Sequence, residues 1–208
     1  MPQPLNYLRE TASQTAGPYV HIGLAPGAAG FRIFDQELGT DIAGPNAKGE
    51  RIRVEGIVTD GTGAPLKDVL IEIWQANAAG IYASPGDSRH GEVEDGFRGW
   101  GRIISDFDTG LWSVETVKPG GVPGRNGRAM APHLNLWIVA RGINIGLNTR
   151  MYFEDEAEAN AADPVLNLVE HVERRKTLVA RREVRDGVPV YGFDIRLQGE
   201  GETVFIDV

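Results

Sequence analysis

Alternation of apolar and polar residues predicts β-strands in several stretches of this chain. In the clearest stretch, which begins at Arg51, Ile52, Val54 and Val58 recur at the two-residue spacing of a half-buried strand. Strand-favouring segments between turn residues predict further strands over residues 69–76, 102–105, 111–117, 133–140, 149–153 and 204–208. The dipeptide Asp186-Gly187, which suits a tight turn, predicts a hairpin between residues 181–185 and 188–197. The predicted fold class is therefore all-β, in the form of a β-sandwich.

Outside these strands, the pattern predicts a long arm and a few short helices. Residues 1–50 are punctuated by Gly and Pro and have no sustained periodicity, so we expect an extended N-terminal arm that wraps over another surface. Helix-favouring residues at 154–162 predict a short helix that ends before Pro164, and residues 166–177 predict a second one. No linker or internal repeat divides the sequence, so residues 1–208 are predicted to form a single domain.

Composition narrows the possible partners and sites. The net charge of −8 and the pI near 5.0 argue against binding to nucleic acid or to anionic membranes. The absence of cysteine excludes disulfides, thiolate nucleophiles and Cys-ligated metal sites. The first residues do not combine a basic stretch with an apolar run, and no stretch of about 18 apolar residues occurs. We therefore expect a cytoplasmic protein.

The histidines form no metal-binding pattern by their spacing. They are His21, His90, His133 and His171, and no two of them stand two or four residues apart. No nucleophile elbow, phosphate-binding loop or dinucleotide-binding glycine motif is present. From composition and spacing alone, the chain is a β-sandwich without a recognisable catalytic set.

Five segments, in family order, resemble the intradiol ring-cleaving dioxygenases. They are residues 71–82, 99–106, 116–120, 131–135 (Ala-Pro-His-Leu-Asn) and 149–153 (Thr-Arg-Met-Tyr-Phe). The resemblance implies a β-sandwich that, in active members, holds one ferric ion with two tyrosinates, two histidines and a hydroxide. Residues 13–24, 140–144 and 195–205 are also similar to the alpha chain of those members that are built from alpha and beta chains.

Only half of the positions that match the family's iron ligands hold a suitable residue. Tyr82 matches one tyrosine and His133 matches one histidine. Val122 stands in place of the second tyrosine, and Asn135 stands in place of the second histidine. Because two donors are too few for a ferric ion, the resemblance implies that no metal binds to this chain. Fe(III) is expected in the partner beta chain instead.

Two supporting positions of the family site also differ. Met130 stands in place of an arginine, unless a gap places Arg128 there, and Arg150 stands in place of a glutamine. A stand-alone dioxygenase with relocated iron ligands is an alternative, for which Tyr152 and His90 are the nearby candidates. A second alternative is a non-enzymatic β-sandwich that serves as a binding module.

The resemblance also implies a role for this chain in the partner's substrate pocket. Gly17, Pro18 and Tyr19 of the arm, together with Arg141, would line the pocket of a beta chain in a large alpha–beta hetero-oligomer. We expect the Tyr19 hydroxyl to anchor the carboxylate of a small aromatic substrate that reacts with O₂. Arg141 would supply positive potential there, since a desolvated carboxylate needs a cation or hydrogen-bond donors.

The four tryptophans divide into two expected groups. Trp74 and Trp112 are predicted to anchor the core, because large apolar rings dominate β cores. Trp100 and Trp137 are predicted to lie at an interface.

Overall fold

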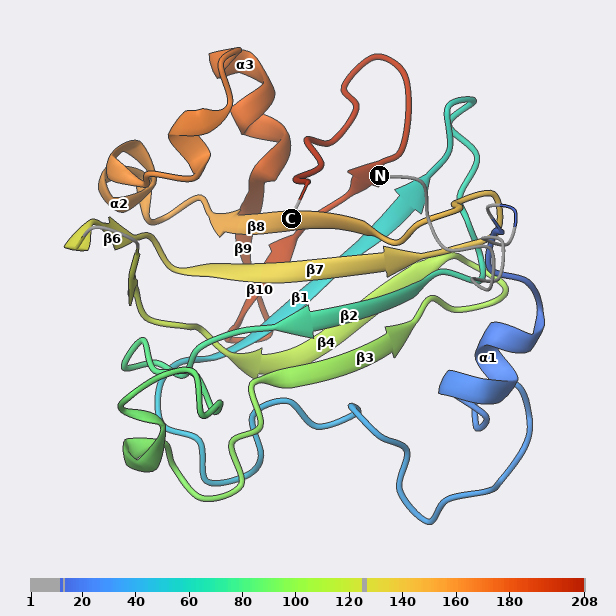
Figure 1. Cartoon of the computed structure of the whole chain (residues 1–208), viewed down its shortest axis with the longest axis horizontal. Helices are drawn as coiled ribbons and strands as arrows, with labels where there is room; N and C mark the ends of the chain where they lie inside the picture. The colour runs from blue at the N-terminus through green and yellow to red at the C-terminus, as the bar shows by residue number, and fades with distance from the viewer. Residues whose placement is uncertain (1–11, 13, 125–126, 208) are drawn as a thin grey trace, which may run out of the picture.

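The computed structural model describes residues 12, 14–124 and 127–207, and most of its regular structure is β-strand (Figure 1). The strands are β1 (Arg51–Thr59), β2 (Leu70–Trp74), β3 (Trp100–Ile104), β4 (Leu111–Val117), β5 (Val122–Pro123), β6 (Ala129–Met130), β7 (His133–Val139), β8 (Leu147–Phe153), β9 (Val179–Arg185), β10 (Val188–Gly192) and β11 (Ile195–Arg196). The helical elements are α1 (Tyr19–Leu24), η1 (His90–Glu92), α2 (Ala157–Ala162), η3 (Leu166–Leu168), α3 (Val172–Arg175) and η4 (Lys176–Leu178).

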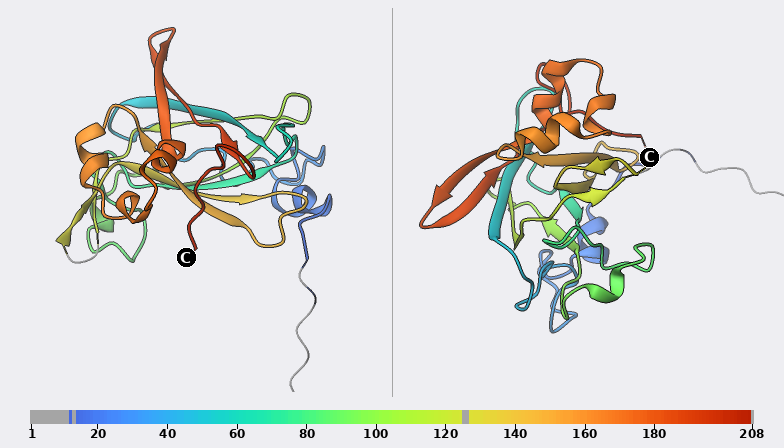
Figure 2. Two further views of the ribbon diagram at one scale, coloured as in Figure 1. Left: turned by 90° about the horizontal axis from the view of Figure 1, so that it is seen from above. Right: turned by 90° about the vertical axis from the view of Figure 1, so that its left-hand side faces the viewer.

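The strands form two layers that are connected through β9 and β10. In one layer, β1 pairs with β4 in antiparallel register and with β10 and β11 in parallel register. In the other, β8, β7, β2 and β3 are neighbours with antiparallel pairing. The β9 strand pairs in parallel with β8 and in antiparallel register with β10, which joins the layers. The far part of the β9–β10 hairpin projects from the body of the molecule (Figure 2).

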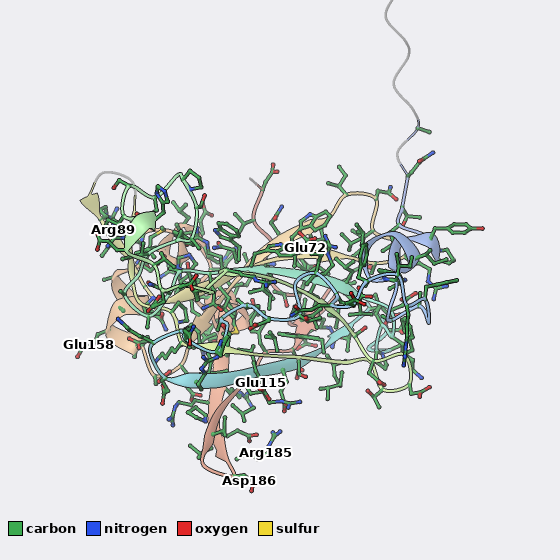
Figure 3. All side chains as sticks on the ribbon, turned by 90° about the horizontal axis from the view of Figure 1, so that it is seen from below. Glu72, Arg89, Glu115, Glu158, Arg185 and Asp186 are labelled. Atoms are coloured by element: carbon green, nitrogen blue, oxygen red, sulfur yellow. The ribbon has the colours of Figure 1, made fainter. Side chains whose placement is uncertain are left out.

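The main core lies between these two layers. Along β1, buried side chains alternate with less buried ones, as the two-residue period of a strand requires. The core side chains include Ile52, Val54, Trp112, Leu134, Leu136, Ile138 and Met151. Figure 3 shows Glu72 and Glu115 on the two separate layers, with Arg185 and Asp186 at the tip of the projecting hairpin. The prediction of an all-β sandwich with a few short helices is confirmed.

The predicted arm is not extended along its whole length. Residues 1–11 and 13 lie outside the described residues, and α1 forms at Tyr19–Leu24. This helix has only six residues and no side-chain cap, so the local sequence contains no signal that predicts it. It is held by a tertiary contact, because the buried His21 ring lies 3.0 Å, Nε2 to O, from the carbonyl of Asp68.

The predicted strand at 204–208 is wrong over residues 204–207, and Val208 lies outside the described residues. Residues 204–207 lie beside β8 in space but make only isolated hydrogen bonds with it. The Ile206 N–H donates to the Asn148 carbonyl at 2.8 Å, and the Thr149 hydroxyl donates to the Val204 carbonyl at 2.7 Å. A continuous ladder does not form.

In residues 12, 14–124 and 127–207, no helix has the length and apolar content that a membrane crossing requires.

Candidate functional site

A row of four side chains crosses the outer face of the β3-β2-β7-β8 layer. The backbone register places Trp74 beside Trp100 on β3 and beside Asn135 on β7, and places Asn135 beside Arg150 on β8. The row faces away from the core, because neighbours along the strands such as Ile73 point into it. A cavity of about 1130 Å³ opens over this row, and Met130, Arg128 and Trp137 also line it.

The position of Trp74 corrects one prediction. Its side chain is 36% exposed at the cavity, whereas Trp112 is fully buried in the core as predicted. Trp74 shares the outward face of β2 with Glu72, two residues before it, and the strand period fixes this orientation. Trp100 and Trp137 are half-buried in the cavity wall.

Five of the six positions that match the family's iron site line this cavity or a smaller one of about 410 Å³ next to it, and the sixth, His133, lies within hydrogen-bond distance of Tyr82. Trp74 lines both cavities, and Tyr82 and Val122 line the smaller one. The Tyr82 ring stacks on Trp74, with ring centroids 6.0 Å apart and an interplanar angle of 11°. Val122 is buried and pairs with Met130 between β5 and β6. His133 is buried at the start of β7.

The two potential metal donors form a neutral hydrogen-bonded pair. His133 Nδ1 lies 2.7 Å from the Ala131 carbonyl and donates to it, so Nε2 is left as the acceptor. The Tyr82 hydroxyl lies 3.4 Å from this Nε2 and donates to it. Burial, together with the charge of Arg150, lowers the pKa of His133 to about 4. Burial raises the pKa of Tyr82, so at neutral pH neither side chain is charged.

Arg150 lies close enough to the two potential metal donors to influence the pKa of both. Its Nε donates to Asn135 Oδ1 at 2.9 Å, and its Nη1 lies 3.4 Å from the sulfur of Met130. The Asn135 amide oxygen is therefore engaged by a guanidinium. A fixed positive charge beside the two donors opposes metal binding. Arg128, the other possible match to the family's arginine, is exposed at the rim.

The two candidates for relocated ligands do not complete the site. The Tyr152 ring lies 5.9 Å from the His133 ring, but its hydroxyl donates to Asp163 Oδ1 at 3.0 Å and burial raises its pKa. His90 lies in η1, where Nδ1 is 2.9 Å from the Asp87 carbonyl. In the part of the chain that the structure describes, no three His, Cys, Asp or Glu side chains are grouped to hold a metal. The donor chemistry present here does not fit a ferric ion.

Sequence reasoning missed the role of Asp163, which it interpreted only as the end of a helix. The Asp163 carboxylate is fully buried and accepts hydrogen bonds from the backbone N–H groups of Ala131, Val165 and Leu166 at 2.7–2.8 Å. It also accepts the Tyr152 hydroxyl. Asp163 therefore fixes the segment that leads into β7. The only signal in the sequence was an acidic residue directly before a proline.

The predicted substrate-pocket residues lie at the other end of β7. Gly17 and Pro18 immediately precede α1, and Tyr19 opens it with a side chain that is 81% exposed. Arg141 lies two residues beyond the end of β7, a strand that spans about 20 Å from His133 to Val139. Figure 1 shows α1 and β6 at opposite ends of the layer. The structure brings the arm and Arg141 to one end, apart from the six iron-site positions.

Comparisons with known proteins agree with this architecture. A family model described as Dioxygenase (Dioxygenase_C) matches residues 28–199. The chain is 52% identical to the protocatechuate 3,4-dioxygenase alpha chain of Pseudomonas putida, over 98% of this chain and 99% of that one. It is 45% identical to the alpha chain from Burkholderia cepacia, over 97% and 98%, and 34% identical to the beta chain from the same species, over 74% and 67%.

Solved structures show the same fold at low identity. Catechol 1,2-dioxygenase from Pseudomonas arvilla C-1 is similar with a TM-score of 0.55 and 24% identity, over 76% of this chain and 55% of that one. The dioxygenase domain of a carbohydrate-binding fusion protein from Streptomyces sp. SirexAA-E has a TM-score of 0.55 and 22% identity, over 94% and 100%. Together with the match over residues 28–199, these findings show that the chain belongs to the intradiol ring-cleaving dioxygenase family.

Proposed function

We propose that this chain is the alpha subunit of a protocatechuate 3,4-dioxygenase. With a beta chain, it would cleave the ring of 3,4-dihydroxybenzoate between the two hydroxylated carbons to give 3-carboxy-cis,cis-muconate. Both atoms of O₂ enter this product, so no external reductant is needed. The proposal depends on one observation, the 52% identity to an alpha chain over nearly the whole length of both proteins.

In this proposal the ferric ion belongs to the beta chain. The donors at the matching place in this chain are Tyr82 and His133, which are neutral and bonded to each other. Val122 offers no donor atom, and Arg150 brings a positive charge. A trivalent cation requires anionic donors, and this site supplies none at neutral pH. The chain would therefore contribute to the reaction from outside the metal centre.

Exposed apolar side chains in the arm support a subunit contact. Large apolar residues are exposed in the segment after α1, namely Phe31, Ile33, Phe34 and Leu38. Ile145, in the connection that contains Arg141, is also exposed. Apolar groups that cluster in one region of a surface are typical of protein interfaces. A beta chain that covers this region would remove them from water.

The distance between the two ends of β7 supports a contribution to the pocket of another chain. Arg141 lies beyond the far end of β7, about 20 Å from His133, and Tyr19 lies at the same end of the layer, so neither can serve a substrate at this chain's own iron-site position. A guanidinium and a phenol hydroxyl are suitable partners for a substrate carboxylate. We assign them, with Gly17 and Pro18, to the substrate pocket of the neighbouring beta chain.

Iron content and colour test the subunit assignment. The chain would be purified alone and after co-expression with a beta-type partner. We expect colourless, iron-poor protein from the chain alone and a coloured complex with one iron per alpha–beta pair, because tyrosinate bound to Fe(III) absorbs visible light. Stoichiometric iron, or ring cleavage, in the chain alone would favour a stand-alone dioxygenase. A complex without iron or activity would favour a binding module.

Kinetics of two variants test the assigned substrate contacts. Tyr19→Phe and Arg141→Ala complexes would be assayed with protocatechuate and with catechol, which lacks the carboxylate. We expect KM for protocatechuate to rise about tenfold or more in Arg141→Ala, as a charge-assisted hydrogen bond is lost. KM for catechol should change little. If both variants keep the wild-type KM and kcat, these contacts are wrong, while the subunit assignment would still be judged by iron.

A further inference from the structure

The backbone on both sides of Arg141 is attached to the N-terminal arm. The Gly142 N–H donates to Thr15 Oγ1 at 2.7 Å, and the same hydroxyl lies 3.5 Å from the Ala140 carbonyl. These two positions flank Arg141 in the sequence. One arm residue therefore holds the loop that carries the guanidinium, four residues before Tyr19.

The arm is attached a second time just after Tyr19. His21 Nε2 donates to the Asp68 carbonyl oxygen at 3.0 Å, and the imidazole packs edge-on against Phe107 with centroids 5.4 Å apart. The His21 side chain is buried, although its helix is otherwise largely exposed. The tripeptide at residues 17–19 is therefore held between two anchors, one on each side.

Asp68 makes the connection between these anchors. Its carboxylate Oδ2 lies 2.5 Å from Arg141 Nη2, while its backbone carbonyl accepts the hydrogen bond from His21 Nε2. The Arg141 side chain is 63% exposed and the Asp68 side chain only 18%. The ion pair therefore holds the long, exposed side chain of Arg141 against the largely buried carboxylate of Asp68.

The backbone next to Asp68 is itself rigidly held. The Val69 N–H donates to Ser105 Oγ at 2.9 Å, and the Ser105 N–H donates to the Val69 carbonyl at 2.9 Å. Val69 and Ser105 are both buried. Asp68 is therefore a fixed point of the sandwich from which both the arm helix and the guanidinium are positioned.

We propose that Asp68 is a positioning residue that presents Arg141 and Tyr19 as one preorganised surface to the substrate of the neighbouring chain. This inference rests on the proposed function, which gives these two residues their substrate. A long exposed side chain loses rotamer freedom when it binds a ligand, and an ion pair formed in advance removes part of that cost. Because a guanidinium has five N–H donors, it can bind Asp68 and a substrate carboxylate at once.

Asp68→Asn tests the proposal with little structural change. The substitution removes the carboxylate charge and leaves the backbone carbonyl that holds His21. In the alpha–beta complex, we expect KM for protocatechuate to rise about fivefold, kcat to stay within twofold and KM for catechol to stay unchanged. Asp60→Asn is the matched control. Its carboxylate lies in the same β1–β2 connection and accepts hydrogen bonds from Thr62 and Ala64 within that turn.

A double variant separates orientation from charge. If Asp68 acts by orienting Arg141, Asp68→Asn should have no further effect on KM in an Arg141→Ala background. If only the charge of Arg141 matters, Asp68→Asn should lower KM, because the guanidinium is no longer neutralised. That result would overturn the proposal, and so would an equal rise in KM for catechol.

A second variant tests the other anchor. Thr15→Val removes the hydroxyl that holds the Arg141 loop, and Thr15→Ser keeps it. We expect Thr15→Val, but not Thr15→Ser, to raise KM for protocatechuate with kcat preserved. If Arg141→Ala raises KM while neither Asp68→Asn nor Thr15→Val does, the positioning role is refuted and the substrate contact stands. If Arg141→Ala also has no effect, both assignments fall, and the iron measurement still decides the subunit assignment.

Discussion

Replacement of Asp163 by asparagine should lower the free energy of unfolding by about 3 kcal/mol. In the wild type, Oδ1 accepts three hydrogen bonds and Oδ2 accepts the Ala131 N–H. The asparagine amide can keep its oxygen at the Oδ1 position only if its NH₂ group takes the Oδ2 position. The NH₂ group then faces the Ala131 N–H, which loses its acceptor. An unsatisfied buried donor costs about 1–3 kcal/mol.

Two further terms set the magnitude. The three remaining hydrogen bonds lose their charge assistance, at roughly 1 kcal/mol each. Removal of a buried charge returns a few kcal/mol of desolvation free energy. The sum is about 3 kcal/mol, which corresponds to a fall in Tm of about 6–12 °C for a domain of this size.

Thermal unfolding of the purified complex, followed by tryptophan fluorescence, measures this loss. Tyr152→Phe removes one hydrogen-bond donor and leaves the carboxylate, so it should cost about 1 kcal/mol. Asp108→Asn, at an exposed turn position, controls for the change in net charge and should leave Tm unchanged. A Tm for Asp163→Asn equal to that of Asp108→Asn would refute the reasoning, because it would mean that relief from charge burial offsets the lost hydrogen bonds.

Three other predictions concern stability. The pKa of His133 is lowered in the folded state. Its contribution to the free energy of unfolding should therefore be complete above about pH 6.5 and decline by about 3 kcal/mol as the pH falls to about 4. Urea unfolding of His133→Gln, measured at several pH values, should lack this pH-dependent loss. Gly80→Ala should lower the free energy of unfolding by at least about 2 kcal/mol, since φ at Gly80 is +71° and an added Cβ would lie 2.0 Å from the Gly121 carbonyl oxygen. Gly63→Ala is the control in the same denaturation assay. It should cost about 1 kcal/mol, because φ is +86° but the added Cβ would meet no other atom. Lys118→Met should lower Tm at pH 7 by several degrees, because it removes the ammonium group whose Nζ lies 2.8 Å from Asp155 Oδ2 and 2.7 Å from Glu156 Oε1. The same Tm in variant and wild type would contradict this prediction.

Alternation predicted the strands well because each strand has one buried face. The predicted and observed limits of β4 coincide, and the Asp186-Gly187 turn separates β9 from β10. Local pattern failed where tertiary contacts decide the structure. The α1 helix depends on a buried histidine in a sequence without helical periodicity. Residues 204–207 form a short, mostly apolar run but do not form a ladder with β8.

The candidate site was predictable only in part. Family segments identified Tyr82, His133 and the replaced positions, and the structure shows that they are neighbours. The hydrogen bond from Arg150 to Asn135 needed the strand register, which no single segment contains. The link from Asp68 to Arg141 joins positions that are far apart in the sequence, in two loops with no alternation. The outward orientation of Trp74 could have been inferred from its two-residue spacing to Glu72.

The hydrogen bond from Arg150 Nε to Asn135 Oδ1 makes the loss of the family's ligand set difficult to reverse by single mutations. Asn135→His alone would remove the amide oxygen that accepts from Arg150 and would place an imidazole nitrogen against a guanidinium, which would compete with a metal ion for its lone pair. Val122→Tyr alone would force a phenol into a buried position of valine size. Neither step alone supplies a full set of iron ligands, and the positive charge of Arg150 would still oppose metal binding. The three positions are coupled by epistasis, and in evolution this favours continued dependence on a second gene product over recovery of an autonomous enzyme.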